Sequence, residues 1–263
     1  MTETWRTAGA TLITLGVSLV ACASGVTGPE DQGLAASGQS SDSASSDGVD
    51  VSVILGAFVD QVELSVEGDE IIIRSDNVPD HPSPYFPTTD PRHEAYNGSN
   101  GSFRINPNQI QEQDITYRIP RYPHAGTEAQ ETPPGPIGVA LNGVAFFNQY
   151  AGGQVVGAFQ SNSFDQYNGH PQQTGVYHYH KEPLHLTDAH GSDALIGVLL
   201  DGFPVYGPVE DGARLSSDDL DAAHGHFGIT PEFPQGIYHY HITDDDPWIN
   251  GAGFHGVPGS VLG

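Results

Sequence analysis

The sequence predicts a mainly β domain built from two pseudo-symmetric tandem repeats, with long irregular loops between the strands. Three observations support this fold class. The string Tyr-His-Tyr-His occurs at residues 177–180 and again at 238–241. Short apolar or alternating runs are separated by many of the 33 Gly and 20 Pro residues, which is typical of strands joined by turns. Only one short segment, around 217–223, has the composition of a helix, with Ser216 or Ser217 as its cap.

The chain begins with an expected targeting segment. Residues 8–21 are apolar but too short to cross a bilayer as a helix, and they end in Leu-Val-Ala-Cys at 19–22. This pattern resembles a bacterial lipoprotein signal peptide, so we expect residues 1–21 to be removed and Cys22 to carry lipid. The protein would then be extracytoplasmic and held at the cell envelope or surface through that lipid alone. An ordinary secretory signal with an incidental cysteine is the alternative.

Residues 22–50 are rich in Gly, Ser, Ala and Asp and are expected to form a disordered, flexible tether before a domain at 51–263. Cys22 is the single cysteine, so we expect no disulfide within the domain. The whole chain has 8 Lys and Arg against 33 Asp and Glu, a formal charge of −25. Nucleic acid is therefore excluded as a partner, because phosphate binding requires basic clusters. An acidic, solvated surface explains the charge more simply than a dedicated cationic partner does.

The pattern is β-like from Val51 onward. Residues 62–66 alternate apolar and polar side chains, and 70–74 form a short buried-type run. Glu67-Gly68-Asp69 between them predicts a hairpin turn. The proline-broken segment 76–123 is expected to wrap against the core, because so long a loop needs packing.

The repeat is larger than the Tyr-His-Tyr-His string. Residues 137–143 align with 196–202, and 164–170 align with 220–226, with offsets of 59 (202 minus 143) and 56 (226 minus 170). The strings themselves are offset by 61 (239 minus 178), so insertions and deletions fall in the connections. We therefore expect two copies of one module, at about 137–181 and 196–242.

The repeats concentrate histidine in a pattern that suits a metal. On a strand, alternate residues point to the same face and lie roughly 6.6 Å apart, so two imidazoles can converge on one ion. Each copy adds a third histidine after a glycine. The candidate ligands are His170, His178, His180, His226, His239 and His241. Copper or zinc is favoured and iron is possible, whereas a cysteine-type zinc site is excluded. One shared site and two equivalent sites both remain open, as does an ordinary strand whose histidines bond to backbone or water.

Other side chains have weaker assignments. The tyrosines of both strings would point to the opposite face and pack in the core. Asp201, aligned with Asn142, is a weak catalytic or metal-supporting candidate, and stabilising the turn is its simpler role. Asp165 and Asp221 align and could orient the Gly-His segments. The histidines without a counterpart in the other repeat are expected to be surface or structural residues, and His81 and His224 are the first candidates for exceptions.

Several motifs together resemble the YHYH-motif family of extracytoplasmic proteins. The resemblance covers most of residues 75–256, and it rests on the segments 77–82, 142–143, 168–171, 175–180, 201–207 and 236–241. It implies no particular activity. It also suggests that many members carry cysteines near the first motif and near the end of the domain. This chain has none there: those neighbourhoods hold Tyr167, His185, Ala222 or Ala223, and Ala252 or Gly253.

The sequence supports three functions. The first is a lipid-anchored protein that binds a transition metal through the duplicated strands. The second is a metal-dependent hydrolase or oxidase in which an open coordination position activates water or oxygen. The third is a metal-free module that binds glycan or protein through exposed tyrosines, Trp248 and Asn-Gly loops. A concave site beside the histidines would favour the second, and a flat aromatic face the third.

Overall fold

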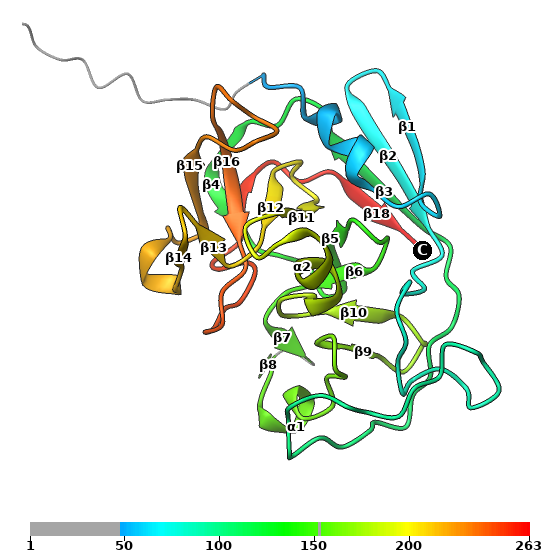
Figure 1. Cartoon of the computed structure of the whole chain (residues 1–263). Coiled ribbons are helices and arrows are strands. Elements are labelled where there is room, and N and C mark those ends of the chain that lie inside the picture. The colour runs from blue at the N-terminus through cyan, green and yellow to red at the C-terminus, as the bar shows by residue number, and fades with distance from the viewer. Residues whose placement is uncertain (1–47, 152–153) are drawn as a thin grey trace, which may run out of the picture. The chain divides into compact units, whose positions relative to one another are not determined.

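The computed structural model describes residues 48–151 and 154–263. The expected signal peptide, Cys22 and nearly all of the expected tether lie outside these residues. Within the described part of the chain, no helix is long and apolar enough to cross a membrane. The prediction of a mainly β fold is confirmed, since strands far outnumber helices among the described residues (Figure 1).

A four-stranded antiparallel sheet is formed by segments from both ends of the domain. Its order is β1-β2-β3-β18, with bounds Glu63–Glu67, Glu70–Ser75, Ile115–Pro120 and Ser260–Leu262. The predicted hairpin is present: Glu67 pairs with Glu70, and Gly68 has a φ of 65° in the turn. The expectation of β structure from Val51 onward is wrong for the first seven residues. Val51–Ala57 form a 3-10 helix, η1, which is capped by the Asp50 side chain.

An eight-stranded sheet contains both repeats, in the order β15-β16-β12-β11-β5-β6-β10-β9. The first repeat supplies β5 (Pro136–Ala140), β6 (Ala145–Phe147), β9 (Gly169–Pro171) and β10 (Tyr177–Tyr179). The second supplies β11 (Leu195–Leu199), β12 (Pro204–Tyr206), β15 (Gly225–Gly228) and β16 (Ile237–His241). Read outward from the centre, the two halves of this sheet have the same sequence of strands.

The pairing makes the symmetry explicit. In each half the first two strands are antiparallel, the second is parallel to the Tyr-His-Tyr-His strand, and that strand is antiparallel to the Gly-His strand. At the centre β5 and β11 are antiparallel, with Val139 opposite Val198. These valines occupy the same position of the repeat, 59 residues apart. An approximate two-fold axis therefore passes through this pair.

Short elements complete the domain. Three two-stranded ribbons pair β4 (Ala125–Gln130) with β17 (Phe254–Gly256), β7 (Tyr150–Ala151) with β8 (Gln154–Val155), and β13 (Val209–Glu210) with β14 (Ala213–Arg214). The helices are α1 (Ala158–Ser161), α2 (Leu184–His190) and the 3-10 turn η2 (Ser217–Asp219). The helix expected at 217–223 is thus a single turn, because Leu220 is extended and the next residues form the turn that leads into β15.

The segment before β3 packs against the first repeat, as expected. Asn77 joins two strands of the large sheet: its side chain donates to the carbonyl of Tyr177 (2.7 Å) and accepts from the amide of Ala145 (2.8 Å). Farther along, the Tyr85 hydroxyl bonds to the carbonyl of Ser163. Part of the predicted wrapping segment is regular structure, since Ile115–Pro120 form β3. Residues 115–119 do alternate apolar and polar side chains, so this strand had a sequence signal that the interpretation of 76–123 as a wrapping loop overlooked.

Candidate metal centres

Each Tyr-His-Tyr-His strand divides its side chains between the two faces of the sheet. The four tyrosines are buried, which confirms their expected core role. The histidines project from the other face, and the Gly-His strand places a third one directly across the ladder. His170 is opposite His178, and His226 is opposite His239. The sequence thus brings together three imidazoles in each half, because alternation along one strand and register with its neighbour coincide.

The turn before each Gly-His strand is held by an acidic side chain. Asp165 accepts hydrogen bonds from the Gly169 amide (3.3 Å) and the Tyr177 hydroxyl (2.8 Å). Asp221 accepts the corresponding bonds from Gly225 (3.2 Å) and Tyr238 (2.9 Å). The predicted orienting role of both acids is therefore confirmed. The glycine is required because the tyrosine ring lies against it: a Cβ on Gly169 would be 2.3 Å from the Tyr177 ring.

In the first repeat, His170, His178 and His180 form the group that we call centre 1. The Nε2 atom of His178 lies 3.1 Å from that of His170 and 3.0 Å from that of His180. Three nitrogens bound to one tetrahedral ion at 2.0–2.1 Å would be separated by about 3.3 Å. The observed spacing is therefore close to that of a metal site.

The hydrogen bonds of the other ring nitrogens determine where the protons are. Nδ1 of His178 faces the carbonyl of Val176 (3.1 Å), and Nδ1 of His180 faces that of Asn148 (2.6 Å). A carbonyl can only accept, so both Nδ1 atoms carry hydrogen. Nδ1 of His170 lies 2.7 Å from the Ser163 hydroxyl, which donates its own hydrogen to the Gln160 carbonyl (2.6 Å). All three Nε2 atoms of the neutral rings are consequently bare lone pairs that face one another.

Burial keeps these rings neutral. Desolvation lowers the pKa of His170 to about 3 and that of His180 to about 4, and the neighbouring His180 imidazole adds to the effect at His170. The pKa of His178 lies well below its ordinary value for the same reason. Protonation of one of the three Nε2 atoms is thus unfavourable. A cation that coordinates nitrogen satisfies them all.

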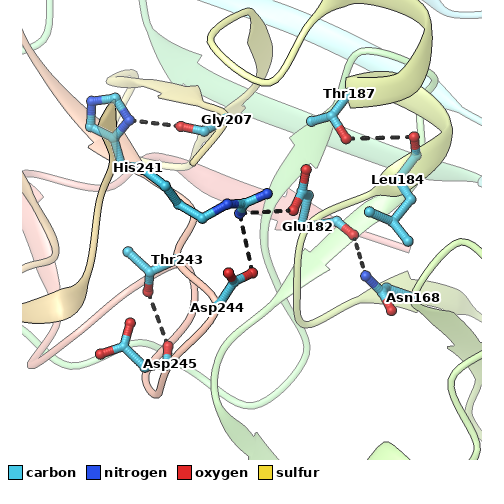
Figure 2. A network of polar contacts seen from close by, with 10 residues as sticks. Asn168, Glu182, Leu184, Thr187, Gly207, His241, Thr243, Asp244 and Asp245 are labelled. Carbon is cyan, nitrogen blue, oxygen red and sulfur yellow. Dashed lines mark hydrogen bonds and ion pairs between the residues drawn. The ribbon is translucent and has the colours of Figure 1, made fainter. Parts of the chain in front are cut away.

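In the second repeat, His226, His239 and His241 are joined by Glu210 in the group that we call centre 2. Nδ1 of His239 faces the carbonyl of Ile237 (3.1 Å), as in centre 1. Nδ1 of His241 faces the carbonyl of Gly207 (2.8 Å), a contact that Figure 2 shows. Nε2 of His226 lies 3.2 Å, and that of His239 3.6 Å, from the Glu210 carboxylate. The buried Nε2 atoms of His226 and His241 have no hydrogen-bond partner in the described part of the chain.

Glu210 is a functional candidate that the sequence did not reveal. It lies in the two-residue strand β13, and its counterpart in the first repeat is not acidic, so the duplication gave no signal for it. The same hairpin contributes Arg214 on β14. Nη1 of Arg214 lies 3.2 Å from Asp244 and 3.6 Å from Glu182, which follows the first Tyr-His-Tyr-His strand. Figure 2 labels both of these acids. This contact joins the two repeats beside centre 2.

The two centres are separate. Five inter-strand steps lie between β10 and β16, which at ~4.8 Å a step places the groups roughly 24 Å apart. The version with one shared site is therefore wrong, because no ion can bond to both strands across that distance. Two equivalent positions in a symmetric sheet replace it.

A cavity of about 970 Å³ opens beside centre 1 and is lined by all three of its histidines. Its other walls include residues 104–108, 131–132, 134–135, Phe147, Tyr150 and the Gly251-Ala252 turn. Such a volume is at the upper end of small-molecule sites. The concave surface that the enzyme hypothesis requires is present.

The remaining candidates lie apart from the two centres. The Asp201 carboxylate is buried and accepts from the Tyr240 hydroxyl (2.6 Å), the Gly256 amide (2.9 Å) and the Phe203 amide of its own turn (3.3 Å), so it supports the turn and the tyrosine face. His81 bonds to the Tyr179 hydroxyl (2.8 Å) and His224 to the Thr243 hydroxyl (2.9 Å). Trp248 is only 8% exposed and cannot provide the flat aromatic face of a glycan-binding module.

Fold and site together define a class of protein: a mainly β domain with two internal repeats, each presenting a histidine group that could hold a metal. A family model described as YHYH protein matches residues 116–213 and 209–253, which together span more than half of the chain. The chain belongs to this YHYH family, and the resemblance of the motifs is confirmed. No curated protein matches the chain, and no solved structure does.

Proposed function

We propose that this protein binds two transition-metal ions, one in each repeat. The observation that carries the proposal is the set of three bare Nε2 lone pairs in centre 1, in which Nε2 of His178 lies 3.0–3.1 Å from the other two and every Nδ1 hydrogen is already donated elsewhere. Without a cation this arrangement is repulsive and unsatisfied. Zinc and copper suit imidazole ligands best, and iron is compatible with the histidine and carboxylate set of centre 2.

The anchor is part of the proposal. The Leu-Val-Ala-Cys ending of the apolar leader supports lipidation at Cys22, and the acidic, thiol-poor domain suits an extracytoplasmic site. Lipid would then keep the two metal centres near a membrane surface. Labelling cells with a radioactive fatty acid tests this, since a Cys22→Ser variant should lose the label and appear in the soluble fraction.

Metal content tests the central proposal. The purified protein should contain close to two equivalents of zinc, copper or iron by inductively coupled plasma mass spectrometry. His178→Ala with His180→Ala should remove one equivalent, and His239→Ala with His241→Ala the other, while circular dichroism shows that both variants fold. A metal-free protein that also takes up no added zinc or copper would contradict the proposal.

The second candidate is metal-dependent hydrolysis or oxidation, and the cavity beside centre 1 is what favours it. A metal held by three imidazoles with a vacant position activates bound water or oxygen. Activity towards a panel of model esters, phosphoesters and oxidisable phenols should then disappear with His178→Ala. Activity that survives the loss of the metal would contradict this candidate.

A further inference from the structure

The hairpin that supplies Glu210 has an exact counterpart in the first repeat. β13 and β14 pair Val209 with Arg214 and Glu210 with Ala213. β7 and β8 have the same pairing 59 residues earlier, with Ala151 in the position of Glu210. The same offset relates Asn148 and Gly207, whose carbonyls receive the matching histidine hydrogen bonds. The two hairpins thus approach their centres equivalently but carry different side chains.

This difference closes one centre and opens the other. In centre 2 the Glu210 carboxylate lies within 3.2–3.6 Å of two Nε2 atoms, where it completes a set of four ligands with charge −1. In centre 1 the methyl group of Ala151 supplies no donor, and both Ala151 and the three histidines line the cavity. A divalent ion in centre 1 would keep its full +2 charge and a free coordination position on the cavity side.

We propose that centre 1 is a ligand-exchange site that takes the carboxylate of a small organic molecule from the cavity, whereas centre 2 is closed by Glu210 and structural. This inference rests on the proposed metal binding. The exogenous carboxylate occupies the place of the missing Glu210 counterpart and offsets the charge of the ion.

The lining indicates what the rest of the ligand is like. Apart from the histidines, the charged side chains among the described lining residues are one of each sign, Arg104 and Glu131. The other walls combine amide side chains with apolar surface from Ile105, Phe147 and several prolines. This composition favours a monocarboxylate with a neutral, partly apolar body, because a second negative charge gains nothing from a lining whose charges balance.

Cobalt(II) substitution tests the proposal. The whole protein is loaded with cobalt in a Cys22→Ser background, so that no thiolate contributes to the visible spectrum. Benzoate is the probe, and benzamide, which has the same shape without the charge, is the control. We expect two cobalt ions per chain, with one of them changing its absorption on saturation with one benzoate and neither responding to benzamide.

Variants at the hairpins identify the responding centre. Ala151→Glu should abolish the benzoate response while both cobalt ions remain, and the small Ala151→Ser should retain it. Glu210→Ala should create a second responding ion, which keeps the test decisive if Ala151→Glu does not fold. Two bound cobalt ions without a benzoate response, or a response that persists in folded Ala151→Glu, would overturn this proposal and leave metal binding intact. Failure to bind cobalt at all would instead contradict the proposed function.

Discussion

The tyrosine hydroxyls hold the histidine strands from the opposite face of the sheet. Tyr177 and Tyr238 bond to the acids that precede the Gly-His strands, and Tyr240 bonds to Asp201. The Tyr179 hydroxyl is instead hydrogen-bonded to the neutral side chains of Asn142 and His81. Because each histidine has a tyrosine next to it in the strand, these bonds also fix the orientation of the imidazoles. The motif therefore works as a unit in which one face is anchored and the other is presented.

Removing one anchor tests this arrangement. Tyr240→Phe leaves the buried Asp201 carboxylate without its 2.6 Å donor, and we expect a loss of about 1–3 kcal/mol in the free energy of unfolding. Tyr179→Phe should cost less, because its partners are neutral. Urea denaturation monitored by fluorescence measures both, and Tyr150→Phe on the surface should have no effect. A Tyr179→Phe variant less stable than Tyr240→Phe would contradict the account.

Asp201 also predicts a pH dependence. Burial raises the pKa of its carboxyl from 3.8 to about 6. The folded state therefore binds a proton at Asp201 more tightly than the unfolded state does. The resulting contribution to the free energy of unfolding is complete below pH 3.8 and is lost as pH rises through 6. Asp201→Asn avoids this loss. From pH 5 to pH 8 its unfolding free energy should gain about 1 kcal/mol relative to wild type, whereas exposed Asp60→Asn should show no such trend. A constant difference for Asp201→Asn would contradict the raised pKa.

At the scale of elements, the central strand pair joins the two halves of the large sheet. Gly138 and Gly197 lie on either side of the Val139–Val198 pair, in equivalent positions. A Cβ on Gly138 would be 2.4 Å from the Val198 carbonyl oxygen, and one on Gly197 would be 2.5 Å from that of Val139. Close backbone approach is thus required symmetrically at the axis. This explains why both repeats have glycine here.

A single methyl group at the axis should therefore be costly. Gly197→Ala forces the Val139 carbonyl or the Phe146 ring to move, and we expect the unfolding free energy to fall by about 1–3 kcal/mol. Gly101→Ala is the matched control, because a Cβ there meets nothing within 4 Å. Thermal and urea denaturation of both variants measure the difference. Equal stability of the two variants would show that the central pairing is looser than described.

The sequence predicted those elements whose signals are local or repeated. Alternation identified the β1–β2 hairpin, and the duplicated string placed four histidines on one face and four tyrosines on the other. Three features depend on long-range packing and were missed or wrong. The helix η1 has an apolar pattern that also suits a strand. Glu210 has no repeated counterpart, and the cavity is assembled from segments that are far apart in the sequence.

At the scale of the whole molecule, the buried histidines make the metal-free protein sensitive to acid. The pKa values of His170 and His239 are lowered to about 3 and that of His180 to about 4, chiefly by desolvation. These folded values lie below the ordinary 6.5, so the stability that the neutral rings contribute is complete above pH 6.5 and is lost as pH falls through 4 for His180 and through 3 for His170 and His239. Bound metal adds to this stability, because only neutral imidazole coordinates it.

Metal removal should therefore lower the melting temperature, and the melting temperature of the metal-free protein should fall further as the pH is lowered. We expect the chelator-treated protein to lose stability steeply between pH 6.5 and pH 5, by about 1.4 kcal/mol per pH unit for each histidine that must be charged. Differential scanning calorimetry of metal-free and zinc-loaded samples at several pH values measures this. Identical melting curves for the two samples would show that neither centre binds metal in the folded state.

Anomalous diffraction from crystals grown with zinc, recorded on both sides of the zinc absorption edge, tests the central claim most directly. The account predicts two strong anomalous peaks, one within bonding distance of Nε2 of His170, His178 and His180, and one among His226, His239, His241 and Glu210. The peak in centre 1 should also have a non-protein ligand on the side of the cavity. Crystals with no peak at either group, or with zinc bound only at surface carboxylates, would contradict the account.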